Sequence, residues 1–393
     1  MKVTTKLLSA ILFAGLSGCA ALVCLTACHD DRDEDAGGSM MSKHNVIFYN
    51  SVNGSGDIGY NDDIIKIEIL FSMLNPHVKA VFFTPLDIGA TIEEFYRIDT
   101  MTPSAGDSVL IVLNGSDYTE VSRSNKSLST KNQLTGDEAL DLRVLTFEDD
   151  GHDLPQRVYS FQIQRYGAFY VAGRLLGKKP AAVIAGMRGE TQIEDAVQGF
   201  VDGYSVENPG GPIVCYLADD LSGFDSPEKA VLTCDSIIKS FPAEQFEYKA
   251  DGYEQGLCFV PIAGGSNIGM YAYVHNQPSD RNIEVIGVDA DYNENSSSIP
   301  FSMLTPISAI LNSYLWAWNN NEEWPQWQSF GLDSEYPIEI ELTSYTYPLF
   351  LLRYNPTSTS MPSEDKVLEK VIQDLTREAL EKEKAYIQRK RGG

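Results

Sequence analysis

Histidine and basic residues are scarce in this chain. Only five histidines occur among 393 residues, and no two of them stand at a spacing typical of metal ligands. Lysine and arginine together number 30 against 55 aspartates and glutamates, which gives a formal net charge of −25. A surface this negative repels phosphate backbones, so nucleic-acid binding is a poor interpretation. The 43% of hydrophobic residues exclude wholesale disorder.

The cysteines outside the N-terminus give little information about the fold. Three of the six cysteines lie within the first 28 residues, and Cys215, Cys234 and Cys258 remain. Cys215 and Cys258 both lie in apolar, strand-like runs. We therefore predict small core residues at these two positions rather than a disulfide.

The N-terminus has the pattern of a bacterial lipoprotein signal peptide, assigned to residues 1–27. Two lysines precede an apolar run, and the tetrapeptides L-S-G-C and L-T-A-C end at Cys19 and Cys28. We predict cleavage before Cys28 and lipidation of Cys28, because use of Cys19 would leave the apolar stretch 20–27 on the mature protein. The alternative is an uncleaved anchor helix. In both interpretations the body of the protein is exported.

Residues 28–43 are acidic and glycine-rich and predict a solvated tether. The run H-D-D-R-D-E-D directly after Cys28 also resembles a signal that sends some lipoproteins to the outer face of the outer membrane. A periplasmic spacer is an equal alternative. We expect a lipid-anchored protein of the cell envelope, facing the periplasm or the outside.

The body alternates short apolar strands with helices. The strands are four to seven residues long and do not alternate in polarity, which is typical of parallel strands buried on both faces. The expected strands are 45–49, 78–83, 108–113, 142–147, 158–163, 181–185, 213–217, 257–262 and 284–288. The expected helices include 63–74, 166–176, 190–204, 227–240 and 307–318. This order predicts a doubly wound α/β architecture, in which ligands bind at the carboxyl ends of the strands.

The C-terminal segment differs in composition. Residues 323–346 are rich in tryptophan, tyrosine, proline and acidic residues, and alternation at 337–343 predicts an edge strand. Ser363 is a candidate N-cap, followed by an apolar stripe typical of a helix.

Glycine-rich or acidic loops follow four of the expected strands. Gly54, Gly56 and Gly59 match the dinucleotide pattern G-x-G-x-x-G. A nicotinamide site also needs an acidic residue at the end of the second strand, about 20 residues further on, and the nearest candidate for it, Asp87, comes too late. The loop D-A-D-Y-N-E begins like a calcium loop, but its sixth residue is Glu294 rather than glycine, so calcium is a poor interpretation.

Seven motifs, in order, resemble the basic membrane protein family, the substrate-binding lipoproteins of ABC transporters that include purine-nucleoside receptors. They are G-D-I-G-Y-N-D (56–62), V-Y-S-F-Q-I with G-A-F-Y-V-A-G (158–173), A-A-V-I-A-G-M (181–187), Q-G-F-V-D-G (198–203), F-D-S-P-E-K (224–229), A-G-G-S-N-I-G (263–269) and G-V-D-A-D (287–291). The resemblance covers roughly residues 44–320. The acidic segment 148–153 and the tail beyond Trp318 have no clear counterpart in it.

The resemblance implies a two-lobed type I periplasmic binding protein fold with three crossovers, each lobe a doubly wound parallel sheet. It implies lobe 1 over 44–163, lobe 2 over 164–288 and a return to lobe 1 over 289–320. Residues 321–393 are expected to form a C-terminal strand and helix on lobe 2.

The resemblance also implies a ligand site. Tyr60 would stack on a base and Asn61 would pair with a base edge. Phe224 would close the sandwich from the other lobe, and Asp289 would accept hydrogen bonds from ribose hydroxyls. Gly264 and Gly265 would offer backbone groups to the ligand.

Three function classes follow. The first is a lipoprotein that captures a small polar ligand, such as a nucleoside, for an ABC permease. The second is a surface-exposed or sensory binding protein of the same fold with no transporter of its own. The third, an enzyme, is disfavoured because the sequence shows no catalytic Ser/His/Asp set, no metal cluster and no convincing carboxylate pair. We expect no cofactor and no nucleic-acid partner.

Overall fold

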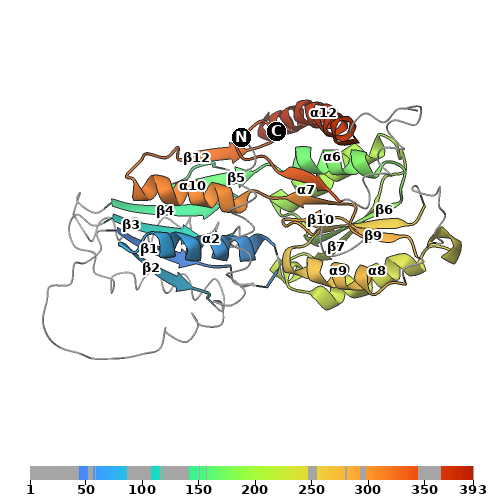
Figure 1. Ribbon diagram of the computed structural model, residues 1–393, viewed down its shortest axis with the longest axis horizontal. Helices are drawn as coiled ribbons and strands as arrows, with labels where there is room; N and C mark the ends of the chain where they lie inside the picture. Colours follow the sequence, from blue (N-terminus) through green and yellow to red (C-terminus); the bar gives the residue numbers. More distant parts are fainter. Residues whose placement is uncertain are drawn as a thin grey trace, which may run out of the picture. The chain divides into compact units, whose positions relative to one another are not determined.

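The computed structural model describes residues 44–51, 56–57, 59–85, 108–115, 118, 141–149, 151–155, 157–246, 255–278, 281–292, 298–343 and 364–392. The predicted signal peptide, the tether and Cys28 lie outside these residues. Within them the chain forms two α/β lobes, each built on a parallel sheet, with a small third sheet at the junction (Figure 1).

The first lobe contains a six-stranded sheet in which every neighbouring pair is parallel. Its order is β12-β5-β4-β3-β1-β2. The strands are β1 (His44–Tyr49), β2 (Val78–Phe83), β3 (Ser108–Leu113), β4 (Asp141–Phe147), β5 (Val158–Ile163) and β12 (Trp327–Phe330). Helices α2 (Tyr60–Leu74) and α10 (Ile307–Asn319) pack against each other beside this sheet (Figure 1). Helix α10, which follows residue 289 in the chain, thus lies beside α2, which follows β1.

The second lobe contains a four-stranded parallel sheet with the order β7-β6-β8-β9. Its strands are β6 (Ala181–Met187), β7 (Ile213–Ala218), β8 (Leu257–Ile262) and β9 (Ile283–Val285). The helices of this lobe are α6 (Tyr166–Leu176), α7 (Thr191–Ser205), α8 (Pro227–Lys239) and α9 (Asn267–His275). Cys234 and Cys258 are buried in its core, and Cys215 is partly buried.

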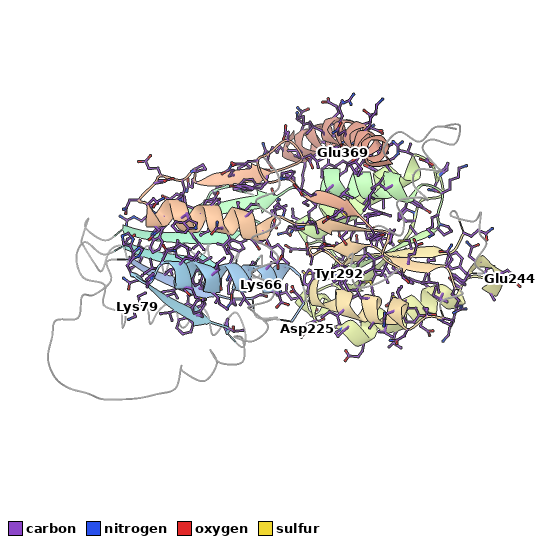
Figure 2. All side chains as sticks on the ribbon, viewed as in Figure 1. Lys66, Lys79, Asp225, Glu244, Tyr292 and Glu369 are labelled. Carbon is purple, nitrogen blue, oxygen red and sulfur yellow. The ribbon has the colours of Figure 1, made fainter. Side chains whose placement is uncertain are left out.

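The expected strand 284–288 is interrupted at Ile286. Residues before the interruption form β9 of the second-lobe sheet, whereas β10 (Gly287–Val288) pairs with β11 (Phe301–Leu304) in the small sheet. Gly287 allows this change of partner, because a Cβ there would lie 2.3 Å from Ser302 Oγ. The interruption places Asp289 just after the point where the chain leaves the second lobe. Tyr292, labelled in Figure 2, follows it and packs its ring against Tyr271 of α9 with the centroids 4.5 Å apart.

Alternation at 337–343 did predict a strand, and β13 (Glu339–Leu342) pairs antiparallel with β11. The structure corrects the expectation that the whole C-terminal segment lies on lobe 2. β12 extends the first-lobe sheet beside β5, with Phe330 in register with Ile163. Helix α12 (Glu364–Gly392) then packs against α6 of the second lobe (Figure 1). No helix in the described ranges is both long and apolar enough to cross a membrane.

The motif Q-G-F-V-D-G serves helix packing. A Cβ on Gly199 or Gly203 of α7 would lie 2.1 Å from the carbonyl oxygen of Tyr166 or Tyr170 of α6, respectively. Glycine at these two positions therefore lets the backbones of α6 and α7 touch. This close packing fixes the direction of α6, whose first residues lie beside the candidate site.

Candidate functional site

A cavity of about 140 Å³ lies where the two lobes meet. All six site residues named from the sequence line it: Tyr60, Asn61, Phe224, Gly264, Gly265 and Asp289. Tyr60, Phe224 and Asp289 therefore lie at one cavity, and their contact with a ligand stays a prediction. The lining segments follow β1, β3, β4, β5, β6, β7, β8 and β10, so the carboxyl ends of strands from both lobes form the cavity, as parallel α/β sheets favour.

Asp57 organises the turn that carries Tyr60 and Asn61. Its carboxylate accepts backbone N–H groups from Gly59 at 3.0 Å, Asn61 at 2.9 Å and Asp62 at 3.2 Å. Helix α2 consequently begins at Tyr60, three residues earlier than expected. Burial raises the pKa of Asp57, and the three backbone donors oppose that shift. A side chain that satisfies the first N–H groups of α2 holds Tyr60 at the cavity wall.

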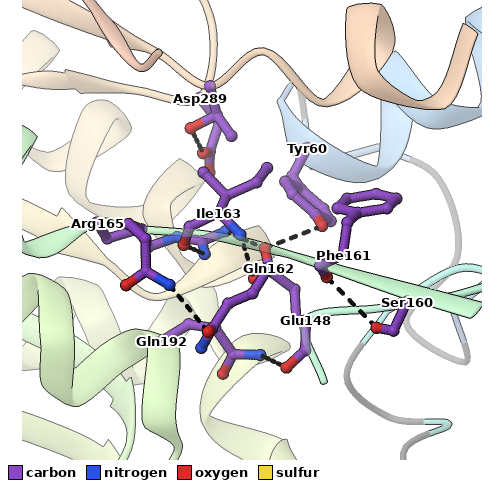
Figure 3. Close-up of polar contacts among 11 residues, drawn as sticks. Tyr60, Glu148, Ser160, Phe161, Gln162, Ile163, Arg165, Gln192 and Asp289 are labelled. Atoms are coloured by element: carbon purple, nitrogen blue, oxygen red, sulfur yellow. Dashed lines mark hydrogen bonds and ion pairs between the residues drawn. The ribbon is translucent and has the colours of Figure 1, made fainter. Parts of the chain in front are cut away.

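The Tyr60 hydroxyl is held by Glu148, which the sequence analysis did not assign to the site. The hydroxyl donates to Glu148 Oε1 at 3.3 Å, and Arg165 Nη2 pairs with the same oxygen at 2.7 Å (Figure 3). Only 4% of the Glu148 side chain and 13% of the Arg165 side chain are exposed. Ile163 N–H donates to Glu148 Oε2 at 3.2 Å, so both carboxylate oxygens are used. Burial, and secondarily Glu148, raises the pKa of Tyr60 well above its usual value, which keeps the hydroxyl protonated.

Phe224 lies at the end of a short 3₁₀ helix, η3 (Leu221–Phe224), that follows β7. Its ring rests on glycines: an added Cβ would lie 2.7 Å from the ring at Gly186 and 3.3 Å from it at Gly264. At Gly265 an added Cβ would lie 3.0 Å from the Phe224 carbonyl oxygen. Gly186 and Gly264 therefore make room for the aromatic ring, whereas the contact of Gly264 and Gly265 with a ligand stays a prediction.

Asp289 stands at a left-handed backbone position with φ 71°, which aspartate and asparagine tolerate better than most residues. Its Oδ1 accepts a hydrogen bond from Thr305 Oγ1 at 2.7 Å. Burial raises the pKa of Asp289 to about 6, although the Thr305 hydroxyl and Arg165 favour the charged form. An ionised carboxylate has about four acceptor sites, so Asp289 retains capacity for donors from a ligand.

Gln192, at the start of α7, is a further cavity residue that the sequence analysis missed. Its Nε2 donates to the carbonyl oxygen of Glu148 at 3.2 Å (Figure 3), which fixes the amide orientation. The side chain is 6% exposed, and within the described part of the chain its Oε1 has no hydrogen-bond partner. A buried acceptor without a donor is costly, so this oxygen favours a donor group in the cavity.

The site combines aromatic faces with acceptors and one ion-paired cation. Such a lining can bind a small molecule that carries an apolar face and several hydroxyl or amino donors. Among the described residues, no group of three or more histidine, cysteine, aspartate or glutamate side chains is arranged to hold a metal ion.

A comparison with protein-family models and a search of curated proteins find no match for this chain. Solved structures do resemble it. The chain is similar to an ABC transporter solute-binding protein from Aeropyrum pernix K1, with 14% identity, a TM-score of 0.62 and coverage of 86% of this chain and 92% of that one. It is also similar to a transcriptional activator of the comK gene from Bacillus halodurans, with 14% identity, a TM-score of 0.55 and coverage of 86% and 97%.

A third similar structure is an ABC transporter solute-binding protein from Burkholderia graminis C4D1M in complex with D-arabinose. It shares 14% identity over 82% of this chain and 100% of that one, with a TM-score of 0.51. Identities this low establish the fold. The chain has the two-lobed α/β fold of type I periplasmic binding proteins, as the sequence analysis expected.

Proposed function

We propose that this protein is a solute-binding lipoprotein that captures a small polar ligand between its lobes for an ABC importer. The main support for this proposal is the cavity that aromatic and polar side chains of both lobes line. The solute-binding proteins among the similar structures support import as the purpose of capture. Within this proposal the chain is not an enzyme, and its partners are the ligand and an ABC permease.

The ligand we propose is a hydroxyl-rich molecule with one apolar face, and a purine nucleoside is the first candidate. The resemblance of seven motifs to the basic membrane protein family supports a nucleoside. Tyr60 and Phe224 offer aromatic faces for a base, while Asp289 and Gln192 Oε1 offer acceptors for ribose hydroxyls. A monosaccharide is the second candidate, because one similar structure holds D-arabinose.

Native mass spectrometry of the freshly purified protein tests this proposal. We expect a co-purified small molecule, released on unfolding, and saturable binding of adenosine or inosine in calorimetric titrations. D-Ribose and D-arabinose form the second arm and would identify a sugar receptor instead. Failure of all four probes, together with a ligand-free mass, would contradict the proposal.

A sensory binding protein without its own transporter is the second candidate function. The similarity to a transcriptional activator supports it, because this fold also serves proteins outside import. The acidic run after Cys28 favours a surface location. Genes for a permease and an ATPase beside this one would support import, whereas their absence from the genome neighbourhood would favour the sensory function.

Anchoring through a lipid on Cys28 is part of the proposal. The L-T-A-C tetrapeptide before an acidic tether supports it. The intact mass of protein extracted from membranes should correspond to a chain that begins at Cys28 and carries acyl groups, and Cys28→Ser should release the protein from the membrane fraction. A retained signal sequence in the wild type would refute this anchor.

Phe224→Ala should weaken nucleoside binding about tenfold or more at little cost in stability. Stacking of a base on an aromatic side chain contributes about 1–3 kcal/mol, and Phe224 lines the cavity instead of filling the core. Phe246→Ala is the matched control: Phe246 is 1% exposed in the second-lobe core, so its truncation should cost about 3–5 kcal/mol of stability. Titration and urea unfolding of both variants measure the contrast. If Phe224→Ala unfolds early and binds normally, the ring has a packing role only.

A further inference from the structure

Two of the chain's crossings between lobes meet at one buried carboxylate, Glu383 of α12. Its Oε2 accepts the backbone N–H of Gly167 at 2.9 Å, where the chain from β5 enters α6. Its Oε1 accepts the backbone N–H of Leu332 at 3.1 Å, just after β12 leaves the first-lobe sheet. Glu383 is 2% exposed. A single side chain therefore joins two crossover segments that lie far apart in the sequence.

The backbone is shaped to admit this carboxylate. A Cβ on Gly167 would lie 2.5 Å from Glu383 Oε2, and a Cβ on Gly331 would lie 2.6 Å from Oε1. Burial raises the pKa of Glu383, and the N–H groups of Leu332 and Gly167 oppose that shift. Because a buried carboxylate without donors would be strongly unfavourable, these two hydrogen bonds account for its tolerance at this position.

Helix α12 is fixed to the second lobe on both sides of Glu383. The Tyr386 ring stacks on Tyr166 of α6, with centroids 4.2 Å apart and an angle of 13° between the planes. The Tyr386 hydroxyl and Lys390 Nζ both reach Asp195 Oδ1 of α7, at 2.8 and 2.7 Å. One turn earlier, Glu378 accepts from the Tyr170 hydroxyl at 2.6 Å. Glu383 thus connects a helix that is packed on the second lobe with the backbone of Leu332, just after β12 of the first lobe.

The same crossover carries two cavity residues. Gly167 lies two residues after Arg165 and two before Phe169, and both side chains line the cavity. Upstream, Glu148 accepts the N–H of Ile163, so a second buried carboxylate fixes the other end of this crossover. The path from β5 into α6 is consequently held on each side by hydrogen bonds to a carboxylate. Movement of two lobes about each other is absorbed by torsion angles in such connecting segments.

We propose that Glu383 is a positioning residue for the ligand site: by joining the two crossovers it fixes the start of α6, and through it the placement of Arg165 and Phe169 in the cavity. The effect on ligand affinity rests on the proposed function. The fixing of the crossovers does not, because it can be measured without ligand.

Hydrogen exchange in the full mature protein, without ligand, is the first test. Glu383→Gln keeps the size of the side chain but turns an NH₂ group toward one of the two backbone N–H groups. We expect the amides of Gly167 and Leu332 to exchange at least about tenfold faster in this variant. Glu381→Gln, an exposed position on the same helix, is the control and should exchange like the wild type. Unchanged exchange at both amides in Glu383→Gln would overturn the proposal.

Gly331→Ala provides a second variant that leaves Glu383 itself intact. Its new methyl group displaces Oε1, so the amide of Leu332 should exchange faster while that of Gly167 changes less. Equal protection of Leu332 in Gly331→Ala and the wild type would also count against the proposal.

Binding of inosine in a double-mutant cycle is the final test, with Glu383→Gln and Arg165→Lys as the two changes. Among the described residues, no hydrogen bond or ion pair joins the two side chains directly, so a purely structural role of Glu383 predicts effects on affinity that multiply within about twofold. Positioning predicts that the double variant loses at least about fivefold less affinity than the product of the single losses. If inosine and adenosine fail to bind the wild type, the proposed function fails, and the exchange measurement still decides whether Glu383 fixes the crossovers.

Discussion

Glu284→Gln should destabilise the protein by about 3–5 kcal/mol, the loss typical when one partner of a buried ion pair is removed. Glu284 of β9 pairs with Lys179 at 2.5 Å, with only 6% and 1% of the two side chains exposed. Lys179 Nζ also donates to Asn282 Oδ1 at 3.2 Å, which does not replace a full negative charge. The neutral glutamine leaves an ammonium group in the core of the second lobe without its counter-charge.

A surface pair of the same length supplies the control. Lys239 and Asp235 also lie 2.5 Å apart, but 74% and 38% of their side chains are exposed. Asp235→Asn should cost less than about 1 kcal/mol, because water and salt screen an exposed pair. Urea unfolding of both variants measures the contrast. Equal losses would show that burial of the Lys179–Glu284 pair does not determine its contribution.

Replacing the buried pair by apolar residues separates the pair's own value from the penalty of breaking it. The double variant Lys179→Met with Glu284→Leu should recover most of the loss, since apolar residues of similar volume often match or exceed a buried ion pair. A double variant as unstable as Glu284→Gln would indicate instead that the pair specifies the local packing.

Much of the fold could be predicted from the sequence, because parallel strands buried on both faces leave short, continuous apolar runs. The expected strands at 78–83, 108–113, 158–163 and 257–262 agree with β2, β3, β5 and β8 at both ends. Partners distant in the sequence leave no such local signal. β12 contains one phenylalanine and one tryptophan among polar residues, and only its pairing with β5 in space makes it a strand.

The contrast between local sequence signals and contacts of distant segments also explains which site residues could be predicted. Tyr60, Phe224 and Asp289 could be named because they belong to motifs that resemble a family and follow predicted strands. Glu148 directly follows β4, and Arg165 comes two residues after the end of β5. The rule that ligands bind at the carboxyl ends of parallel strands could therefore have found them. Their ion pair could not be foreseen, since it depends on Glu148 adopting φ 63°, a left-handed position that is uncommon for glutamate.

Asp289→Asn should make the empty protein more stable at pH 7 while it weakens ligand binding. Burial raises the pKa of Asp289 in the folded protein to about 6, from an ordinary value of 3.8. The folded state therefore binds this proton more tightly than the unfolded state. The stabilisation it gives is complete below about pH 4 and is lost as the pH rises through about 6. Above that pH the folded protein must hold a buried charge, which asparagine avoids.

Asparagine suits this position in other respects, so the variant isolates the charge. It keeps an Oδ1 acceptor for the Thr305 hydroxyl and tolerates the left-handed backbone. Melting temperatures should therefore show a stability advantage of Asp289→Asn at pH 7 that disappears near pH 4. Asp291→Asn, a change at an exposed residue two positions away, is the control for removal of a carboxylate from the same loop.

Ligand binding should follow the opposite pH dependence. A hydrogen bond from a ligand hydroxyl contributes about 1.5–3 kcal/mol when the acceptor is a charged carboxylate, against about 0.5–1.5 kcal/mol when the acceptor is neutral. Inosine affinity of the wild type should therefore rise between pH 5 and pH 7, as Asp289 loses its proton. In Asp289→Asn the affinity should be roughly tenfold lower at pH 7 and nearly independent of pH over this range. Calorimetric titration of both proteins at the two pH values provides the measurement.

If the variant binds as tightly as the wild type, Asp289 does not contact the ligand. In that case a stability advantage of Asp289→Asn would still show that burial of the charge destabilises the folded protein, and it would say nothing about ligand contact.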